Sequence, residues 1–483
     1  MITMTLAEVA AVTGGRLHRA TGDEQVTSVE FDSRKAAPGV LFLALPGERV
    51  DGHSFAAAAV AAGAAGVLAA REVDAPSVVV PPAAGAAGTY LAENDPDGAG
   101  AAVLAALAKL ARHSVDSLTD DSLEGLAVVG VTGSSGKTST KDLLAAVLAP
   151  LGPTVAPPGS FNNELGHPWT ALRADAGTRH LVLELSARGP GHIAALCRIA
   201  PPRIGVVLNV GRAHLGEFGS PEAIAQAKGE LVEALPAGGV AVLNADDPAV
   251  AAMATRTAAR VVPVGRGADA LVRAVDVTSD AGRARFRLVT PAGEADVALR
   301  LVGAHHVGNA LSAAAVALEL GATPAGVAES LSAAAPASRW RMEVADRADG
   351  VTVVNDAYNA NPESMRAALE ALADLGRDRR TWAVLGRMAE LGDTEAAAHA
   401  EVAGAAAALG VGTLVAVGEP GYGPAARHVT DPAAALALLR AEVSPGDVVL
   451  VKASRAVGLD RVADALLNDT PRDDRQENEL VSR

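Results

Sequence analysis

The stretch from Leu126 to Leu144 constrains the fold more than any other part of the chain. It reads LAVVGVTGSSGKTSTKDLL: an apolar run rich in valine, a turn with two glycines, and then helix formers. Where a strand leads through a glycine turn into a helix, backbone N–H groups and the positive end of the helix dipole face the turn and bind phosphate. The sequence therefore predicts a nucleotide phosphate site. Its residues are Gly133, Ser134, Ser135, Gly136, Lys137, Thr138 and Ser139.

Two side chains of this turn carry the chemistry of a phosphate loop. Lys137 supplies a positive charge to the phosphates, and the Thr138 hydroxyl is placed to bind Mg²⁺. The strict pattern GxxxxGK[ST] has glycine where this chain has Val131, so only the shorter string GxxGK[ST] is present. An ordinary glycine turn before a helix is the alternative interpretation.

The net charge of −15 argues against proteins that depend on a basic surface. Nucleic acids and anionic membranes attract positively charged faces, so neither is expected as the main partner. The single cysteine, Cys197, cannot form an internal disulfide, which is typical of a reducing compartment. The first residues lack a basic segment followed by an apolar core, and no apolar run has membrane-spanning length. We therefore expect a cytoplasmic protein without stable membrane insertion.

Lysine is scarce in a chain that uses arginine for most of its cations. Lysine and arginine together number 41, but only six are lysine: Lys35, Lys109, Lys137, Lys141, Lys228 and Lys452. A primary amine is a compact charge and can take part in chemistry that a guanidinium cannot. The six positions are therefore weak candidates for function, and Lys137 is among them.

The 483 residues suggest about three domains, and the predicted fold class is α/β. Residues 1–121 are expected to form a small mixed α/β domain. Residues 122–337 alternate strands with helices, typical of a mostly parallel sheet, with an antiparallel excursion over residues 259–302. Residues 338–468 predict a second doubly wound, Rossmann-like sheet without a phosphate loop. Residues 469–483 are charged and almost free of apolar residues, so we expect disorder there.

One carboxylate interrupts a buried-strand pattern. The run from His180 to Ser186 reads HLVLELS, with Glu184 among apolar residues. Burying an unpaired carboxylate is costly, and an acid on a strand beside a phosphate loop holds the Mg²⁺ of the nucleotide in many ATPases. Glu184 is therefore a candidate metal ligand. A satisfied glutamate on an edge strand is the alternative.

His214 and Lys228 are weaker candidates when judged by position alone. His214 follows the strand that ends near Val210, and ligands gather beyond the carboxyl ends of parallel strands. A single histidine is more often structural. Lys228 lies on the helix predicted from Pro221 to Leu235, where a solvated lysine is the ordinary interpretation.

Two polar loops complete the set of candidates. Asp32, Ser33 and Arg34 follow a predicted strand over residues 26–31, and a solvated loop with an internal ion pair is the alternative there. Asn162 and Asn163 are adjacent amides in the loop FNNELGHP that precedes a helix.

Together these motifs resemble those of the Mur ligases of bacterial cell-wall synthesis, over about residues 26–465. In chain order they are GVTGSSGKTST, NNELGHP, LELSARGPGHIA, NVGRAHL, AKGEL, LNADDP, GAHHVGNALSAAA, RMEV, NDAYNANPESM and VKASR. Within the family, NNELGHP, DAYNANP and LGRMAELGD are most similar to the members that join D-alanyl-D-alanine to UDP-N-acetylmuramoyl-tripeptide. The resemblance implies an N-terminal domain for the UDP end, a central ATPase domain and a C-terminal Rossmann-like domain that closes over the site.

The resemblance also implies ATP, two Mg²⁺ ions and a role for each candidate residue. At the ATP it places Gly133, Gly136, Lys137, Thr138, Asn309, Arg341 and Asp356. At the metals it places Thr138 and Glu184 for one ion, and His214 and Lys228, as its N6-carboxylated form, for the second. At the substrate it places Ser33 and Arg34 near the uridine, Asn162 and Asn163 near the sugar or phosphates, and Lys452, Ser454 and Arg455 near the peptide. Lys137, His214 and Lys228 are thus the implied catalytic residues.

The implied reaction activates the tripeptide carboxylate as an acyl phosphate, which the amine of D-alanyl-D-alanine then attacks. Lys137 and the metal ions would neutralise the two anions that must meet. We expect a monomer whose domains close about hinges near residues 121 and 338, which keeps water from the intermediate. A sister ligase for another amino acid, a P-loop ATPase switch and a non-catalytic nucleotide sensor are the alternatives.

Two residues depart from the family pattern. Arg387 stands where LGDMxELG has an acid, and Ala453 stands where KGSR has glycine. Both lie in the third predicted domain, so the details of peptide recognition are the part of the resemblance that they affect.

Overall fold

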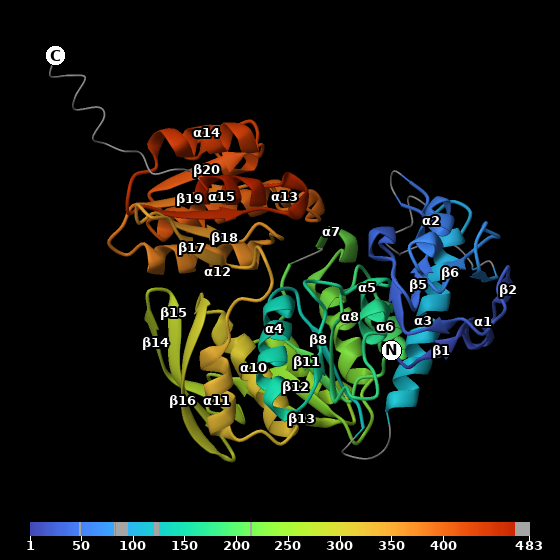
Figure 1. Ribbon diagram of the computed structural model, residues 1–483. Helices are drawn as coiled ribbons and strands as arrows, with labels where there is room; N and C mark the ends of the chain where they lie inside the picture. The colour runs from blue at the N-terminus through green and yellow to red at the C-terminus, as the bar shows by residue number, and fades with distance from the viewer. Residues whose placement is uncertain (48–49, 82, 84–94, 120–124, 213–214, 469–483) are drawn as a thin grey trace.

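The computed structural model describes residues 1–47, 50–81, 83, 95–119, 125–212 and 215–468, which form three α/β domains (Figure 1). The predicted fold class is therefore confirmed. The predicted boundary at 121 and the predicted tail over 469–483 lie outside the described residues. The boundaries stay predictions.

The N-terminal domain, blue in Figure 1, is built on a five-stranded sheet in the order β2-β7-β6-β5-β4. A separate antiparallel pair, β1 and β3, lies beside it. The elements are β1 (Met4–Thr5), α1 (Leu6–Thr13), β2 (Arg16–His18), β3 (Gln25–Val26), β4 (Ser28–Glu30), η1 (Ser33–Lys35), β5 (Val40–Leu43), η2 (Gly52–Phe55), α2 (Ala56–Ala61), β6 (Gly66–Ala69), β7 (Ser77–Val79) and α3 (Ala99–Leu118).

Two local predictions for this domain were wrong. The single strand expected over residues 26–31 is split between two sheets at Thr27, because the N–H groups of Thr27 and Ser28 both donate to the Gly39 oxygen. The linker expected over residues 115–124 begins later. Helix α3 continues to Leu118, and Val115 on its apolar face is buried.

The central domain has a nine-stranded sheet in the order β16-β15-β14-β13-β12-β11-β8-β10-β9. Its strands are β8 (Ala127–Thr132), β9 (Thr154–Val155), β10 (His180–Glu184), β11 (Ile204–Val207), β12 (Val240–Asn244), β13 (Arg260–Gly265), β14 (Val272–Asp280), β15 (Arg283–Thr290) and β16 (Gly293–Val302). Its helices are α4 (Lys137–Leu148), η3 (Ala149–Leu151), α5 (Gly166–Ala171), α6 (His192–Ile199), α7 (Leu215–Phe218), α8 (Pro221–Glu233), α9 (Pro248–Ala251), η4 (Ala252–Arg256), α10 (His306–Glu319) and α11 (Pro324–Ala333).

Strands β8 to β14 pair in parallel with one another, and β15 pairs antiparallel with both β14 and β16. The antiparallel excursion expected over residues 259–302 is therefore shorter than predicted. β13 reads RVVPVG and pairs in parallel with β12, so it belongs to the main sheet. The central strand β8, all of it buried, leads straight into the phosphate loop and α4.

The C-terminal domain, orange to red in Figure 1, has a six-stranded sheet in the order β17-β18-β22-β19-β20-β21. All its strands are parallel except the edge strand β17. The elements are β17 (Glu343–Asp346), β18 (Thr352–Asn355), α12 (Pro362–Leu375), β19 (Thr381–Leu385), η5 (Gly392–Thr394), α13 (Glu395–Ala408), β20 (Thr413–Val417), η6 (Pro420–Tyr422), β21 (Arg427–Val429), α14 (Pro432–Glu442), β22 (Val448–Lys452), η7 (Arg455–Val457) and α15 (Asp460–Leu467).

The N-terminal and central domains share one apolar core. Side chains of α3 such as Leu107 and Leu110 join the same cluster as Leu181 and Leu183 of β10. The indole N–H of Trp169 on α5 donates to the Val29 oxygen at 2.9 Å, across the same contact. Because these apolar side chains are buried together, the N-terminal and central domains pack as one body. Within the described residues, no helix combines the length and apolar character needed to cross a membrane.

Candidate active site

A cavity of about 320 Å³ lies where the central domain meets the C-terminal domain. Most of the predicted site residues line it, although they come from elements far apart in the sequence. Those residues are Ser134, Ser135, Gly136, Lys137, Thr138, Ser139, Asn162, Asn163, Asn309, Arg341, Asp356 and Lys452. The cavity is therefore our candidate active site, and the roles of its residues are proposals.

The phosphate loop forms one wall of the cavity. Gly136 has a φ of +80°, a conformation that favours glycine, and it precedes α4 directly. A Cβ at Gly136 would lie 2.7 Å from Asn309 Oδ1, so the loop and α10 approach closely. Lys137 Nζ donates to the Gly133 oxygen at 2.6 Å. Burial lowers the pKa of Lys137 to about 8, and the Glu184 carboxylate opposes that shift.

Glu184 lies at the carboxyl end of β10, next to the phosphate loop. Its Oε2 accepts hydrogen bonds from the Ser160 hydroxyl at 3.1 Å and from Thr138 Oγ1 and Asn162 Nδ2 at 3.3 Å each. Its Oε1 is buried and has no hydrogen-bond partner among the described residues. β10 pairs with both β8 and β9, so the edge-strand interpretation of Glu184 was wrong. A fully buried carboxylate with an unused oxygen suits a cation ligand.

Lys228 is buried on α8, with only 5% of the residue exposed. Burial lowers its pKa well below the ordinary value, and the positive charge of Lys137 lowers it further. The interpretation of Lys228 as a solvated helix lysine was therefore wrong. His214, the other residue predicted for the second metal, lies outside the described residues.

The C-terminal domain reaches the phosphate loop through Arg341. Its guanidinium donates to Thr138 Oγ1 at 3.3 Å and lies over the Tyr358 ring, 4.1 Å from the centroid. Asp356 accepts the N–H of Met342 at 3.1 Å and pairs with Lys452 at 2.6 Å. These contacts place cationic and anionic groups of the C-terminal domain opposite the loop that would hold the nucleotide.

Asn162 and Asn163 have different surroundings although they are neighbours. Asn162 Nδ2 donates to Ser160 Oγ at 3.0 Å as well as to Glu184. Asn163 Oδ1 accepts the N–H groups of Leu165 and Gly166, at 3.3 and 2.9 Å, at the start of α5. Asn163 therefore has a structural role at a helix start in addition to its position on the cavity wall.

Four predicted substrate residues do not line the cavity. Ser33 and Arg34 lie in η1 of the N-terminal domain, where Arg34 pairs with Asp32 and holds the pKa of that carboxyl at about 2. The internal ion pair that was the alternative there is thus present. Ser454 and Arg455 do not line the cavity either.

Ser454 and Arg455 support neighbouring segments. Ser454 Oγ accepts the N–H of Ala389 at 2.9 Å, and the Arg455 guanidinium lies 3.9 Å from the centroid of the Trp340 ring. Of the two departures from the family pattern, Arg387 forms an ion pair with Glu395. Ala453 is fully buried and packs against Gly386, where an added Cβ would lie only 2.8 Å from the Ala453 Cβ. Arg387 and Ala453 therefore both have defined partners in the C-terminal domain.

Several cavity residues were missed by sequence reasoning. Ser160, Arg188, His305, Tyr358 and Glu390 line the cavity but were not singled out. All except Ser160 lie within the motifs quoted for the resemblance, so the motifs were a usable signal. Nothing in the local pattern distinguishes Ser160, whose position depends on the long-range contact with Glu184.

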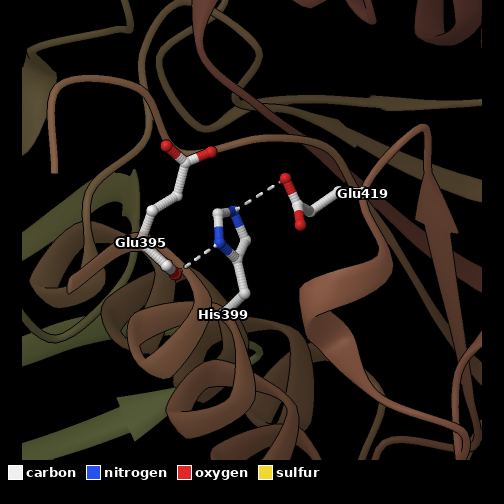
Figure 2. A group of neighbouring side chains, drawn as sticks. All are labelled: Glu395, His399 and Glu419. Atoms are coloured by element: carbon white, nitrogen blue, oxygen red, sulfur yellow. Dashed lines mark hydrogen bonds and ion pairs between the residues drawn. The ribbon is translucent and has the colours of Figure 1, made fainter. Parts of the chain in front are cut away.

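One group of side chains has metal-like spacing but does not fit a metal. Figure 2 shows Glu395, His399 and Glu419, whose ligand atoms lie within 4.8 Å of one another. His399 Nδ1 donates to the Glu395 backbone oxygen at 2.7 Å, and Nε2 accepts the Met388 N–H at 2.9 Å. Both ring nitrogens are used, so neither offers a lone pair. The group instead holds the loop 386–392 that carries Glu390 to the cavity.

The fold and this cavity define an ATP-using ligase of three domains, and the comparisons with known proteins agree. Three family models match: "Mur ligase family, catalytic domain" over residues 25–114, "Mur ligase middle domain" over residues 131–317, and "Mur ligase, glutamate ligase domain" over residues 340–455. The chain belongs to the Mur ligase family.

Relatives of known name cover nearly the whole chain. The chain is 56% identical to UDP-N-acetylmuramoyl-tripeptide--D-alanyl-D-alanine ligase of Mycobacterium tuberculosis, over 97% of this chain and 98% of that protein. It is 35% identical to the ligase of that name in Escherichia coli, over 96% and 99%.

Solved structures with the same architecture include a MurF of Acinetobacter baumannii, with a TM-score of 0.83, 30% identity and coverage of 97% of this chain and 99% of that one. MurF ligase of Thermotoga maritima, solved in complex with ADP, has a TM-score of 0.75 at 30% identity, with coverage of 91% and 96%.

Proposed function

We propose that this protein is the ligase that joins D-alanyl-D-alanine to UDP-N-acetylmuramoyl-tripeptide at the expense of ATP. The product is the UDP-linked pentapeptide, formed in the last cytoplasmic step of peptidoglycan precursor synthesis. The observation that carries the proposal is one cavity bounded by the phosphate loop and by Arg341, Asp356 and Lys452 of the C-terminal domain. Sequence identities of 56% and 35%, over nearly the full length of the chain, to ligases named for this reaction support the same substrates.

The chemistry proceeds by activation of a carboxylate. The terminal carboxylate of the tripeptide attacks the γ-phosphorus of ATP, ADP leaves, and an acyl phosphate forms. The amine of D-alanyl-D-alanine then attacks the acyl carbon, inorganic phosphate leaves with the bonding pair, and the nitrogen loses a proton. Lys137 and Arg341 supply positive charge where the two anions must approach.

The residues present fit Mg²⁺. Thr138, at the start of α4, and Glu184, at the carboxyl end of β10, offer hard oxygen ligands. Glu184 Oε1 is a buried acceptor without a partner in the described part of the chain. When bound, Mg²⁺ neutralises phosphate charge and orients the phosphates. In our proposal Thr138 and Glu184 hold one ion, and His214 and Lys228 serve a second.

Lys228 fits the proposed carboxylation. An ammonium repels a metal, and only a neutral amine adds carbon dioxide. Burial lowers the pKa of Lys228 and so favours the neutral amine. The carbamate is an anionic oxygen ligand of the kind that Mg²⁺ prefers. Enrichment of the intact protein with isotope-labelled bicarbonate, followed by NMR, tests this directly: a carbamate carbon signal should be present, and it should be absent from Lys228→Ala.

The rest of the substrate extends toward the N-terminal domain in this proposal. Asn162 and Asn163 lie on the cavity wall, and Ser33 and Arg34 lie in η1 of the domain beyond. We assign the first pair to the sugar or phosphates and the second pair to the uridine end. The proposal includes a cytoplasmic monomer.

The direct test is to incubate the protein with ATP, Mg²⁺, UDP-N-acetylmuramoyl-tripeptide and D-alanyl-D-alanine and to weigh the product. We expect one new species heavier by the dipeptide less water, with one phosphate released per product. Amide formation with another amino acid, but not with D-alanyl-D-alanine, would indicate a sister ligase. ATP hydrolysis independent of both substrates would indicate a P-loop switch, and either result would overturn the proposal.

A further inference from the structure

The loop over residues 209–212, which follows β11, is bound on one side to the phosphate loop. Ser135 N–H donates to Asn209 Oδ1 at 3.0 Å, and Asn209 Nδ2 donates back to the Ser135 oxygen at 3.2 Å. Gly211 N–H donates to Ser134 Oγ at 2.9 Å. The two loops therefore share hydrogen bonds through both backbone and side chains.

The same loop is bound on its other side to the C-terminal domain through Arg212. The Arg212 N–H donates to Glu363 Oε1 at 3.0 Å, at the start of α12. The guanidinium donates to both oxygens of Glu401 on α13, at 2.9 and 3.0 Å. A two-pronged contact between arginine and a carboxylate fixes orientation as well as distance. Arg212 thus connects two helices of the C-terminal domain to a loop of the central domain.

Two glycines let the domains approach closely beside this connection. A Cβ at Gly211 would lie 2.8 Å from Glu363 Cδ, and a Cβ at Gly216 would lie 2.8 Å from the Gly392 nitrogen. Gly216 N–H also donates to the Glu390 oxygen at 3.2 Å. Figure 1 shows α7 reaching from the central domain toward α13. The two domains are therefore closely packed at Gly211 and Gly216, on either side of Arg212 in the sequence.

We propose that Arg212 is a positioning residue that latches the closed arrangement of the two domains and couples it to the phosphate loop. Its bonds to Glu363 and Glu401 can form only while the C-terminal domain lies against the central domain. Closure would then fix the loop 209–212, which braces Ser134 and Ser135. Arg212 itself does not line the cavity, so its effect on the reaction is indirect. The proposal rests on the proposed ligase function, because it assumes that closure precedes acyl transfer.

The ion pair between Arg212 and Glu401 is partly exposed to solvent, as a contact that forms and breaks reversibly requires. The side chains of Arg212 and Glu401 are 43% and 41% exposed. Such a pair is weak in itself and is screened by salt, so the closed form can open again for product release. Arg366 also donates to Glu401, at 3.4 Å, but it lies in the same domain and does not cross the boundary.

Charge exchange across the boundary tests the latch. The variants are Arg212→Glu, Glu401→Arg and the double variant with both changes. The matched control is Arg427→Glu with Glu442→Arg, an ion pair of similar exposure that lies entirely within the C-terminal domain. For each variant we would measure kcat, the KM of every substrate, binding of a non-hydrolysable ATP analogue, and the radius of gyration by small-angle X-ray scattering with and without analogue plus UDP-linked tripeptide.

We expect each single change at Arg212 or Glu401 to lower kcat/KM for D-alanyl-D-alanine about tenfold. ATP-analogue affinity should stay within about twofold, and the compaction on ligand binding should be lost. The double variant should recover part of the rate and the compaction, because the reversed pair still has Glu363 and Arg366 beside it. The control pair should behave as wild type. Recovery excludes misfolding as the cause.

Wild-type compaction and rate in Arg212→Glu would overturn the latch, as would a double variant no better than the single ones. Failure of the wild-type protein to form the pentapeptide product would instead overturn the proposed function. The two failures are therefore distinguishable.

Discussion

Lys452 Nζ lies 2.6 Å from Asp356 Oδ2, and both residues are buried on the wall of the candidate active site. Lys452 also donates to the Asn359 backbone oxygen at 2.8 Å. Burial lowers the pKa of Lys452, and the Asp356 carboxylate opposes that shift. The sequence prediction gave these two residues separate partners, the peptide and the nucleotide. Their direct contact means that the two predicted roles share one buried ion pair.

Removing one charge of this pair should cost more than removing both. Asp356→Asn leaves a buried ammonium without its counter-charge, so we expect about 3 kcal/mol less free energy of unfolding. Lys452→Met combined with Asp356→Asn should be less destabilised than Asp356→Asn alone. Urea unfolding of the wild type, both single variants and the double variant would measure the coupling. Additive effects would contradict a direct buried pair.

Lys137 should reduce the stability of the fold at neutral pH. Its pKa falls to about 8 in the folded protein from an ordinary value of 10.5, so the unfolded state binds more protons between these values. Stability should therefore rise as pH increases from about 8 to 10.5. Lys137→Met should raise the free energy of unfolding at pH 7 by about 2 kcal/mol and abolish product formation.

The stability gained from Lys137→Met should shrink as the pH rises toward 10.5, the ordinary lysine pKa that applies to the unfolded chain. Near that pH, folding no longer requires the wild-type amine to lose a proton. Denaturant unfolding at a series of pH values would measure both proteins. Lys35→Met, at an exposed position in the N-terminal domain, is the control for loss of a lysine. A gain for Lys137→Met that does not change with pH would contradict the assigned pKa shift.

The sequence predicted those parts of the site that depend on short stretches. The phosphate loop around Lys137 and the strand that carries Glu184 have local signatures, because apolar periodicity and glycine placement are set by neighbouring residues. The phosphate loop lines the cavity, and Glu184 accepts a hydrogen bond from Thr138 of α4 beside it, while their roles stay predictions. The three-domain α/β fold was predictable for the same reason, since strands alternate with helices through most of the chain.

What could not be predicted depends on contacts between distant segments. The Ser454 hydroxyl accepts the Ala389 N–H, in a loop 65 residues away along the chain, and no local pattern indicated this partner. Trp169 fastens the N-terminal domain to the central one through an oxygen 140 residues earlier. Arg212 meets Glu401 across 189 residues. Side-chain partners at such separations are set by domain packing, which leaves no periodic pattern in the sequence.

Lys228 should not tolerate replacement by arginine if it acts as a carbamate. Arginine keeps the positive charge but cannot add carbon dioxide at its guanidinium, and it is too large for a buried site. We expect Lys228→Arg to lose most activity and Lys228→Ala to recover part of it when small carboxylates are added. Steady-state rates with and without acetate or formate would test this. Full activity of Lys228→Arg would contradict the carbamate role.

Gly136 and Gly191 offer a matched pair for testing the phosphate loop. Both have left-handed backbones, with φ of +80° and +87°, so alanine strains each to a similar degree, about 1 kcal/mol. A Cβ at Gly136 would lie 2.7 Å from Asn309 Oδ1, whereas a Cβ at Gly191 meets nothing within 4 Å. Gly136→Ala must therefore displace Asn309 from the nucleotide side of the cavity, and Gly191→Ala need not move anything.

We expect Gly136→Ala to weaken binding of an ATP analogue at least tenfold, and Gly191→Ala to leave it within about twofold, while both lose a similar amount of stability. Calorimetric titration and thermal unfolding would measure the two quantities separately. Asn309→Ala in the Gly136→Ala background removes the clash. If displacement of Asn309 accounts for the whole loss of affinity, this second change should not weaken binding further. Equal loss of affinity in both glycine variants would show that backbone strain, and not the approach of Asn309, controls the nucleotide site.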